Sequence, residues 1–380
     1  MRLTGDWIAA PGVQRVLGLL TGFGYGAYLV GGCVRNAIIN QPIADIDIAT
    51  DALPARVSEI ATEAGLKVVP TGIDHGTVTI IVNGAGYEVT TFRRDVETDG
   101  RRAKVTFSTD IAEDAARRDF TMNALYADAT GQVIDPLGGL ADLSVGRVRF
   151  VGDADARIRE DYLRILRFFR FHAWYGDVSA GLDPAALAAC AANSGGIETL
   201  SRERIGHEIR RLLAAPDPTA SVAAMQVSGI LGRVLPGADV RALGPLVHLE
   251  PPNSAKWLRR LAALGGTGQA GGLRLSGSET KALNNLSEAI ESTTGPAELA
   301  YRLGADMTFD VMLLRAAVFG MKMPSELESE IDRGKNAKFP IKAADLMPGL
   351  EGPGLGAKLA ELESRWIASG FELSREQLLA

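Results

Sequence analysis

Two glycines, with two aspartates close behind them, constrain this chain more than any other feature of its sequence. Residues 27–30 read Ala-Tyr-Leu-Val, Gly31 and Gly32 follow, and an apolar stretch then runs to residue 39. The short apolar run suits a buried strand, and the glycines allow the backbone to turn sharply. A helix that begins after the turn would present unpaired N–H groups, and Arg35, one turn inside, would add a guanidinium. The stretch therefore predicts a phosphate site.

Asp45 and Asp47 form the second half of this pattern. They lie in an isoleucine-rich stretch over 43–48, which predicts a strand with both carboxylates on one face. Two such carboxylates can hold two hard cations about 3.5–4 Å apart, as in-line phosphoryl chemistry requires. A glycine pair alone is usually only a turn, and an Asp-x-Asp strand is more often a solvated edge. Together, at this spacing, they predict a phosphoryl-transfer site.

A β-hairpin is expected next, with arms over 76–82 and 87–92 and a turn over 83–86. On the second arm, Glu88 and Thr90 point to the same face. Glu88 can therefore supply a third acid beside the two aspartates, although a solvated strand glutamate fits the pattern equally well. Elsewhere in this region we expect helices over 11–22 and 54–64 and a strand over 66–69.

This region resembles the nucleotidyltransferase head of class II tRNA CCA-adding enzymes and bacterial poly(A) polymerases, in its motif Leu-Val-Gly-Gly-x-Val-Arg followed by Asp-x-Asp. The family usually has Asp at the position of Asn36, so Asn36 is expected to serve local structure. The resemblance implies an α+β fold, in which a polymerase-β-like palm of mixed β-sheet and helices precedes an all-α neck, body and tail. It covers residues 1–213, and the expected domains are a head over 1–145, a neck over 146–215 and a tRNA-binding body and tail over 216–380.

A second motif, Arg-Arg-Asp-Phe-Thr-Met-Asn-Ala over 117–124, also matches the family. The resemblance implies that Arg118 binds triphosphate or ribose and that Asp119 contacts the sugar; an ion pair at a helix start is the alternative. The charged stretch 93–104 lacks an apolar period and predicts a mobile loop. In the family a loop here is needed for the switch from C to A addition. Asp135, before a proline, matches the linker between head and neck and is expected to act as a hinge.

A single helix is expected over 157–171, with an apolar stripe and a Glu-Asp-x-x-Arg-x-x-Arg motif. Asp161, Arg164 and Arg167 recur every three residues and lie within about 120° of one another, whereas Arg170 falls roughly opposite Asp161. The resemblance assigns this motif to nucleobase recognition.

The chemistry of this motif fits that role. Cytosine and adenine both present an amino donor beside a ring-nitrogen acceptor, which Asp161 and Arg164 can pair with. Guanine and uracil reverse the pattern and would leave buried polar atoms unpaired, at about 1–3 kcal/mol each. An intrahelical salt bridge with a solvated arginine face is the alternative.

Composition limits the classes of protein that fit. The net charge of −6 argues against nonspecific coating of RNA, but arginines cluster over 147–170 and 202–211. Cys33 and Cys190 match no metal or redox spacing. No apolar run reaches the length of a membrane span, and the N-terminus lacks a leader pattern. We therefore expect a cytoplasmic protein with no membrane contact, and no obligate protein partner is evident.

The C-terminal half is expected to be helical and without a catalytic constellation. A helix is expected over 197–213 with Ser201 as its cap, and Ser276-x-x-Glu279 resembles a capping box. Gly/Pro clusters at 264–272 and 348–356 are expected to interrupt the later helices.

The sequence thus predicts a template-independent CCA-adding tRNA nucleotidyltransferase that uses CTP, ATP and Mg²⁺ and releases pyrophosphate. The metal is assigned to Asp45 and Asp47, with Glu88 as a further catalytic acid. The nucleotide-binding residues are Gly31, Gly32, Arg35, Arg118, Asp119, Asp161, Arg164, Arg167 and Arg170. The alternatives are a poly(A) polymerase, a CC-only or A-only adding enzyme, and an inactive RNA-binding relative, against which the intact aspartate pair argues.

Overall fold

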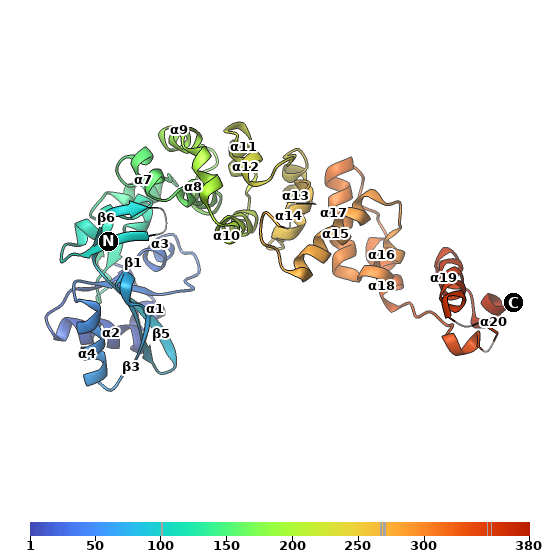
Figure 1. The fold of residues 1–380 in the computed structure, drawn as a ribbon, viewed down its shortest axis with the longest axis horizontal. Coiled ribbons are helices and arrows are strands. Elements are labelled where there is room, and N and C mark those ends of the chain that lie inside the picture. Colours follow the sequence, from blue (N-terminus) through green and yellow to red (C-terminus); the bar gives the residue numbers. More distant parts are fainter. Residues whose placement is uncertain (100–101, 267, 269–270, 348, 351) are drawn as a thin grey trace. The chain divides into compact units, whose positions relative to one another are not determined.

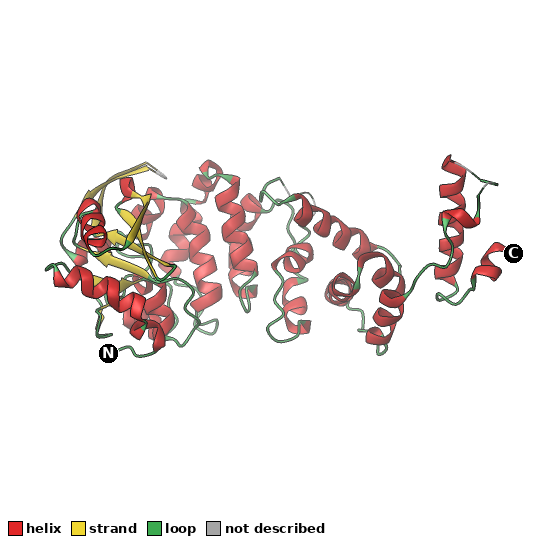
Figure 2. Ribbon diagram, turned by 90° about the horizontal axis from the view of Figure 1, so that it is seen from below, coloured by secondary structure: helices red, strands yellow, loops and turns green. Residues whose placement is uncertain are grey.

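The computed structural model describes residues 1–99, 102–266, 268, 271–347, 349–350 and 352–380 (Figure 1). The chain divides into two compact units, Met1–Val234 and Leu235–Ala380. In the described residues, strands occur only in the first unit, as the yellow arrows of Figure 2 show. The α+β fold class is therefore confirmed. The expected boundaries near 145 and 215 both fall inside the first unit and stay predictions.

A seven-stranded mixed sheet forms the centre of the N-terminal region, in the order β3-β4-β5-β2-β1-β8-β9. Strand β2 pairs with β5 in parallel, and the other neighbours are antiparallel. This arrangement places β2 in the middle of the sheet, where its neighbours fix its register on both sides. The strands are β1 Ala27–Val30, β2 Asp47–Thr50, β3 Lys67–Gly72, β4 Thr77–Val82, β5 Ala85–Thr91, β8 Tyr126–Ala127 and β9 Val133–Ile134.

Helices α2 and α4 supply much of the core that supports this sheet. Each begins with a proline in its first turn, where a missing N–H costs nothing. In α2, Val13, Val16, Leu17 and Leu20 are fully buried. The expected helices at both positions are confirmed. The helices of this region are α1 Asp6–Ala9, α2 Pro11–Gly22, α3 Gly32–Ile38, α4 Pro54–Glu63, α5 Ile111–Ala116 and α6 Gly139–Ser144.

Three antiparallel pairs of consecutive strands follow α4, namely β3–β4, β4–β5 and the pair of β6 Arg93–Asp99 with β7 Arg102–Phe107, and the sequence predicted only the β4–β5 hairpin. Asn83 and Gly84 join β4 to β5 with φ angles of 51° and 84°, as a tight two-residue turn requires, so the turn is shorter than expected. Strands β6 and β7 form a separate two-stranded sheet. The loop predicted over 93–104 is therefore wrong, apart from residues 100–101, which lie outside the described part. Strands pair through backbone hydrogen bonds, which do not require alternating apolar residues, so the sequence pattern did not indicate these two strands.

The single helix predicted over 157–171 is also wrong, because two helices occupy this stretch. Helix α7 Ala154–Glu160 ends at Asp161, whose backbone is extended with φ −156°, and α8 Leu163–Tyr175 begins two residues later. The carboxylate of Asp161 accepts a hydrogen bond from Leu163 N at 3.1 Å and so caps the new helix. The apolar period continues across the break, which is why the pattern did not reveal it.

Helix α8 joins the neck to the N-terminal region through aromatic packing. The ring of Phe120 lies 4.9 Å from that of Phe150 and 5.0 Å from that of Phe171. Ser201 caps the next long helix as expected, but that helix begins at Arg202 and not at residue 197. The remaining elements of the first unit are the 3-10 helices η1 Ile73–His75, η2 Thr121–Asn123 and η3 Ser194–Thr199, and the helices α9 Pro184–Ala192, α10 Arg202–Leu213, α11 Thr219–Val227 and α12 Ile230–Val234.

In the described residues of the second unit, all regular secondary structure is helical. Ser276 and Glu279 form the predicted capping box at the start of α15. The interruption predicted over 348–356 is wrong in its second half, because a helix begins at Gly352. No described helix has the length and apolar character needed to cross a membrane. The helices are α13 Leu243–Leu249, α14 Trp257–Ala263, α15 Gly277–Glu291, α16 Pro296–Leu303, α17 Ala305–Phe319, α18 Leu327–Asn336, α19 Gly352–Ala368 and α20 Arg375–Leu379.

Candidate active site

The glycine turn lies between β1 and α3, as the sequence predicted. Gly31 has φ 72°, a conformation that a residue with a side chain rarely adopts, and its N–H donates to Leu125 O at 3.0 Å. A Cβ atom at this position would lie 3.4 Å from Nη1 of Arg118. The guanidinium of Arg118 therefore lies directly beside the turn, and the structure brings Gly31, Gly32 and Arg118 together.

The three predicted acids lie near the N-terminal end of β2, next to this turn. Asp47 is the first residue of β2, and its Cα is in register with that of Glu88 on the parallel strand β5. Asp45 lies in the loop before β2, so the prediction that both aspartates share one strand is wrong. Partial burial of the Asp47 carboxylate raises its pKa, the charges of Glu88 and Asp45 add to this effect, and Arg118 opposes it. Asp47 therefore lies within electrostatic range of both acids.

These acids suit a divalent cation that a substrate helps to bind. Among the described residues, no group of three or more His, Cys, Asp or Glu side chains is already arranged to hold a metal. Magnesium-type sites, however, commonly use one or two carboxylates together with the phosphates of the substrate. Burial is the main cause of the raised pKa of Asp47, and the negative charges of Glu88 and Asp45 add to it; a bound cation would offset those charges. The donor set and its electrostatics fit such a group.

A buried aspartate that the sequence analysis missed holds Arg118 in place. Asp114 is 1% exposed and accepts hydrogen bonds from Arg118 Nη2 at 2.9 Å, Tyr126 Oη at 2.7 Å and Arg117 Nε at 2.8 Å. Burial raises the pKa of Asp114, but the charges of Arg118 and Arg117 outweigh it and lower the pKa overall. Asp114 lies four residues before Arg118, which is the spacing of helical ion pairs, and this spacing could have indicated the pair from the sequence.

Asp119 connects the second motif to helix α8. Its carboxylate accepts hydrogen bonds from Phe120 N at 2.9 Å, from Asn123 Nδ2 at 2.9 Å and from Arg167 Nε at 2.8 Å. Burial raises the pKa of Asp119, but the charge of Arg167 and these hydrogen bonds lower it to about 2. The structure thus pairs Asp119 with Arg167 of α8, and the predicted contact of Asp119 with the sugar stays a prediction.

Asp161 and Arg164 do not bond to each other through their side chains. Asp161 Oδ2 accepts from Arg204 Nη2 at 2.6 Å, and Arg164 Nη1 lies 2.5 Å from Glu160 Oε2. Arg164 also donates to the carbonyl oxygens of Arg157 and Arg117, at 2.9 and 3.3 Å. The sequence pointed to Arg204 only as part of a basic surface, because a contact between separate helices leaves no local pattern.

Two further predicted residues are enclosed within the protein. Arg170 and Glu208 form a buried ion pair, each side chain 3% exposed, with 2.5 Å between Nε and Oε2. Arg35 is 6% exposed, and its guanidinium lies 4.0 Å from the centre of the Tyr175 ring. Neither side chain is presented to a ligand, so the structure does not bring them into the nucleotide site.

The Asp119–Arg167 pair gives a stability prediction. Asp119→Asn is expected to lower the free energy of unfolding of the first unit by about 1.5–3 kcal/mol, because the partly buried Arg167 loses its counter-charge. A folded pKa of about 2 lies below the unfolded value near 3.9, so this contribution is complete above about pH 4 and disappears as the pH falls towards 2. Urea denaturation between pH 7 and pH 3, followed by tryptophan fluorescence, measures it. Equal stability of variant and parent at pH 7 would show that the pair contributes nothing.

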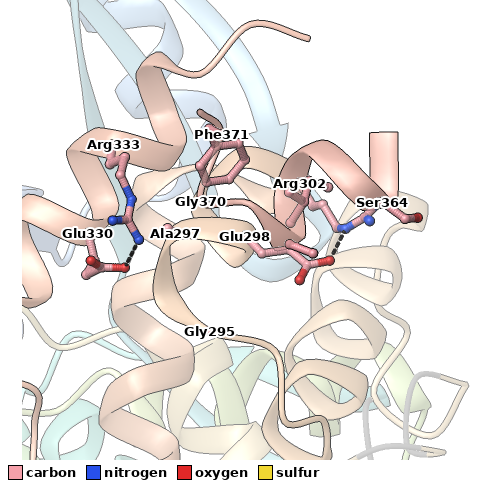
Figure 3. A pocket seen from close by; sticks show the side chains of 11 residues that line it. Gly295, Ala297, Glu298, Arg302, Glu330, Arg333, Ser364, Gly370 and Phe371 are labelled. Atoms are coloured by element: carbon pink, nitrogen blue, oxygen red, sulfur yellow. Dashed lines mark hydrogen bonds and ion pairs between the residues drawn. The ribbon is translucent and has the colours of Figure 1, made fainter. Parts of the chain in front are cut away.

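A pocket in the second unit does not compete for the role of active site. It measures about 430 Å³ and is lined by residues of α16, α18 and α19 (Figure 3). Its two arginines are each paired on their own helix, Arg302 with Glu298 at 2.8 Å and Arg333 with Glu330 at 2.6 Å. Since each cation has its own carboxylate, this pocket offers no excess charge for a phosphate.

Two family models match the chain. The model described as the poly A polymerase head domain matches residues 27–149, and that described as the probable RNA and SrmB-binding site of polymerase A matches residues 181–241. The CCA-adding enzyme of Leuconostoc citreum is 43% identical over 226 residues, 59% of this chain and 54% of the relative. That of Geobacillus thermodenitrificans is 40% identical over 258 residues, or 67% and 59%. The matched part thus spans little more than half of these curated relatives.

Solved structures extend the likeness along the chain. The CCA-adding enzyme of Bacillus stearothermophilus in complex with CTP matches with a TM-score of 0.76 at 27% identity, over 94% of this chain and 92% of that one. The Thermotoga maritima CCA-adding enzyme complexed with tRNA matches with a TM-score of 0.71 at 17% identity, over 99% and 97%, which shows the fold alone. Over residues 27–149 and 181–241, the chain is thus similar to poly(A) polymerases and CCA-adding enzymes.

Proposed function

We propose that the chain is a template-independent tRNA nucleotidyltransferase, which adds C, C and A to tRNA 3′ ends from CTP and ATP and releases pyrophosphate. The observation that carries this proposal is the convergence of Asp47, Glu88 and Asp45 beside the Gly31 turn and Arg118. Carboxylates that can bind a metal ion then lie next to an arginine that can bind phosphates, as the transfer of a nucleotide requires. The names of the similar proteins support the same activity.

Asp45 and Asp47 would hold the metal, with Glu88 beside them. Nucleotidyltransferases of this family need a divalent metal. We assign Mg²⁺, because it prefers carboxylate oxygens and readily shares its coordination with substrate phosphates. Such a metal activates the attacking 3′-hydroxyl and offsets the charge that develops on the triphosphate. Asp47, fixed in the central strand, sets the position of the site, and Asp45 reaches it from the loop.

The phosphates would lie over the glycine turn. Gly31 and Gly32 keep this space free of side chains, and the guanidinium of Arg118 lies next to it. Burial lowers the pKa of Arg118, but Tyr126 and Asp114 raise it well above its usual value, so the residue stays charged. Asp114 and Tyr126 also fix the direction of the side chain, which leaves one edge of the guanidinium for an anion.

Asp161, Arg164 and Arg167 would read the base. Asp161 follows the last residue of α7 and Arg164 lies in the first turn of α8, so the break between the helices brings both to one end of α8. A bound cytosine or adenine would exchange with the contacts that these residues make to Arg204 and Glu160. Arg167, held by Asp119, would support the base from the next turn. Arg170 is no longer part of this assignment, because Glu208 encloses it.

Poly(A) polymerase activity is the second candidate, because the head matches a model named for that enzyme. The resemblance implies that the family needs a loop in this segment to switch from C to A, and the presence of the segment, as the hairpin β6–β7, favours complete CCA addition. The test offers the purified chain, with Mg²⁺, a tRNA transcript without CCA and an unstructured oligoadenylate, and labelled CTP or ATP separately and then together. Two C and one A on the tRNA alone are expected. Long A tracts on either RNA would identify a poly(A) polymerase, and a stop after two C a CC-adding enzyme.

A further inference from the structure

Arg35 is packed in a way that does not suit a phosphate ligand. Its Nε and Nη2 donate to Asn36 Oδ1 at 3.2 and 2.9 Å, Nη2 donates to Tyr175 Oη at 2.9 Å, and Nη1 donates to Asn123 Oδ1. One face of the guanidinium lies over the Tyr175 ring at 4.0 Å. All three nitrogens are therefore used inside the protein, and the residue is 6% exposed. An arginine in this state holds other parts of the protein in position.

The contacts on one side of Arg35 lead to helix α8. Tyr175, at the C-terminal end of α8, contacts Arg35 directly. Asn123, which accepts from Arg35, uses its Nδ2 to donate to Asp119, and Asp119 holds Arg167 about two turns before Tyr175. Arg35 thus fixes the base-reading helix at two separate points along its length.

The contacts on the other side lead to the metal loop, residues 39–46, which contain Asp45. Asn36 Nδ2 donates to Pro42 O at 2.8 Å, and Gln41 N donates to Asn36 O at 2.8 Å. The loop has no strand or helix of its own before β2, so these bonds attach it at its middle. Aspartate at position 36 could still accept from Arg35, but it could not donate to Pro42 O, because an ionised carboxylate has no N–H.

We propose that Arg35 and Asn36 are positioning residues that fix the metal loop, and with it Asp45, against the base-reading helix α8. The inference rests on the proposed function, because it takes Asp45 as a metal ligand and α8 as the base reader. Ordinary catalytic geometry tolerates little displacement, and a misplacement of about 1 Å can cost 100-fold in rate. The contact chain Tyr175–Arg35–Asn36–Pro42 therefore couples the place where the base is read to the place where the metal is held.

The test measures Mn²⁺ binding to the full chain by electron paramagnetic resonance, with Mn²⁺ itself as the probe, and CTP binding in EDTA. Asn36→Asp and Tyr175→Phe alter the two ends of the contact chain by single atoms. Each is expected to weaken Mn²⁺ binding about 3–10-fold, which is less than the usual effect of losing a direct outer partner of a metal ligand, because these residues act on Asp45 through the loop. CTP binding without metal is expected to stay within about twofold, as is KM for CTP, while kcat for C addition falls. The double variant is expected to lose less than the sum, because both changes act through Arg35.

Tyr28→Phe is the matched control, because it removes a tyrosine hydroxyl from the same region outside this contact chain, and it is expected to bind Mn²⁺ like the parent. Arg35→Lys keeps the positive charge but removes the planar guanidinium and its several N–H donors. It is therefore expected to weaken Mn²⁺ binding and to leave CTP binding in EDTA unchanged. Unchanged Mn²⁺ binding in both Asn36→Asp and Tyr175→Phe would overturn the inference, as would a loss of CTP binding without loss of Mn²⁺ in Arg35→Lys. Absence of Mn²⁺ binding by the parent would show that the loop over residues 39–46 does not contribute a metal ligand, and would also overturn the inference. A parent that binds Mn²⁺ but does not extend tRNA would contradict the proposed function separately.

Discussion

Asp47→Ala is expected to reduce nucleotide incorporation at least about 1,000-fold, with the fold intact. Asp47 is the residue on which the other two acids converge, and its removal leaves the metal with a single aspartate. Losses of this size are typical when one member of a group that acts as a unit is removed. Asp47 is the first residue of β2 and is not one of the buried core residues, so its truncation removes little packing.

Single-turnover extension of a tRNA transcript without CCA measures this effect, with circular dichroism as a check on folding. Asp6→Ala, which removes an exposed aspartate from α1 in the same region, is the matched control and is expected to extend tRNA like the parent. Incorporation by Asp47→Ala within about tenfold of the parent would show that the carboxylates do not hold the reacting metal.

Asp161→Ala is expected to lower the preference for CTP and ATP over GTP and UTP about 10–100-fold. On the proposed function, Asp161 accepts from the amino donor of the right base, and a mismatched polar group costs about 1–3 kcal/mol. Since Asp161 lies between α7 and α8 and not among the acids around Asp47, Mn²⁺ binding is expected to stay unchanged. The variant should therefore lose selectivity before it loses the metal.

The four nucleoside triphosphates, compared one at a time by kcat/KM on the same tRNA, measure this selectivity. Asp155→Ala is the matched control, because it removes an acid from α7 that pairs with Arg159 and Asn193 on the neck surface. An equal loss with all four nucleotides, and no relaxed selectivity, would show that Asp161 supports the structure and does not read the base.

Local patterns predicted the features that local chemistry determines. The backbone can turn at Gly31 because glycine readily adopts a φ of 72°, and Asn83 and Gly84 form a tight hairpin turn. Ser276 caps α15 together with Glu279, three residues later. The register of β2 was not predictable, since it depends on β1 and β5 as neighbours, but the spacing of Asp45 and Asp47 still located the acids. Short motifs with strict backbone or capping requirements thus predicted local turns and caps, and the family resemblance that they carry implied the α+β fold class.

The features that the sequence did not predict depend on contacts between distant segments. The hairpin β6–β7 is charged along its length, so no apolar period indicated it. The extended backbone at Asp161 interrupts a helix whose apolar pattern continues on both sides. Arg35 has the residue type and position of a phosphate ligand, but the Tyr175 ring, 140 residues later, covers it. Side-chain roles of this kind are decided by tertiary packing, which a single sequence does not display.

The bond between Arg204 and Asp161 has a consequence for how accurately a base can be chosen. In the chain without nucleotide, the guanidinium of Arg204 already occupies Asp161 Oδ2 at 2.6 Å. On the proposed function, Arg204 is a built-in competitor for the acid, and a base must displace it. Cytosine and adenine carry an amino group at C4 or C6, which replaces the hydrogen bond that is broken, whereas uracil and guanine carry a carbonyl group at that position and replace nothing. Competition from Arg204 therefore lowers the affinity for every nucleotide, and only cytosine and adenine restore the hydrogen bond that is lost.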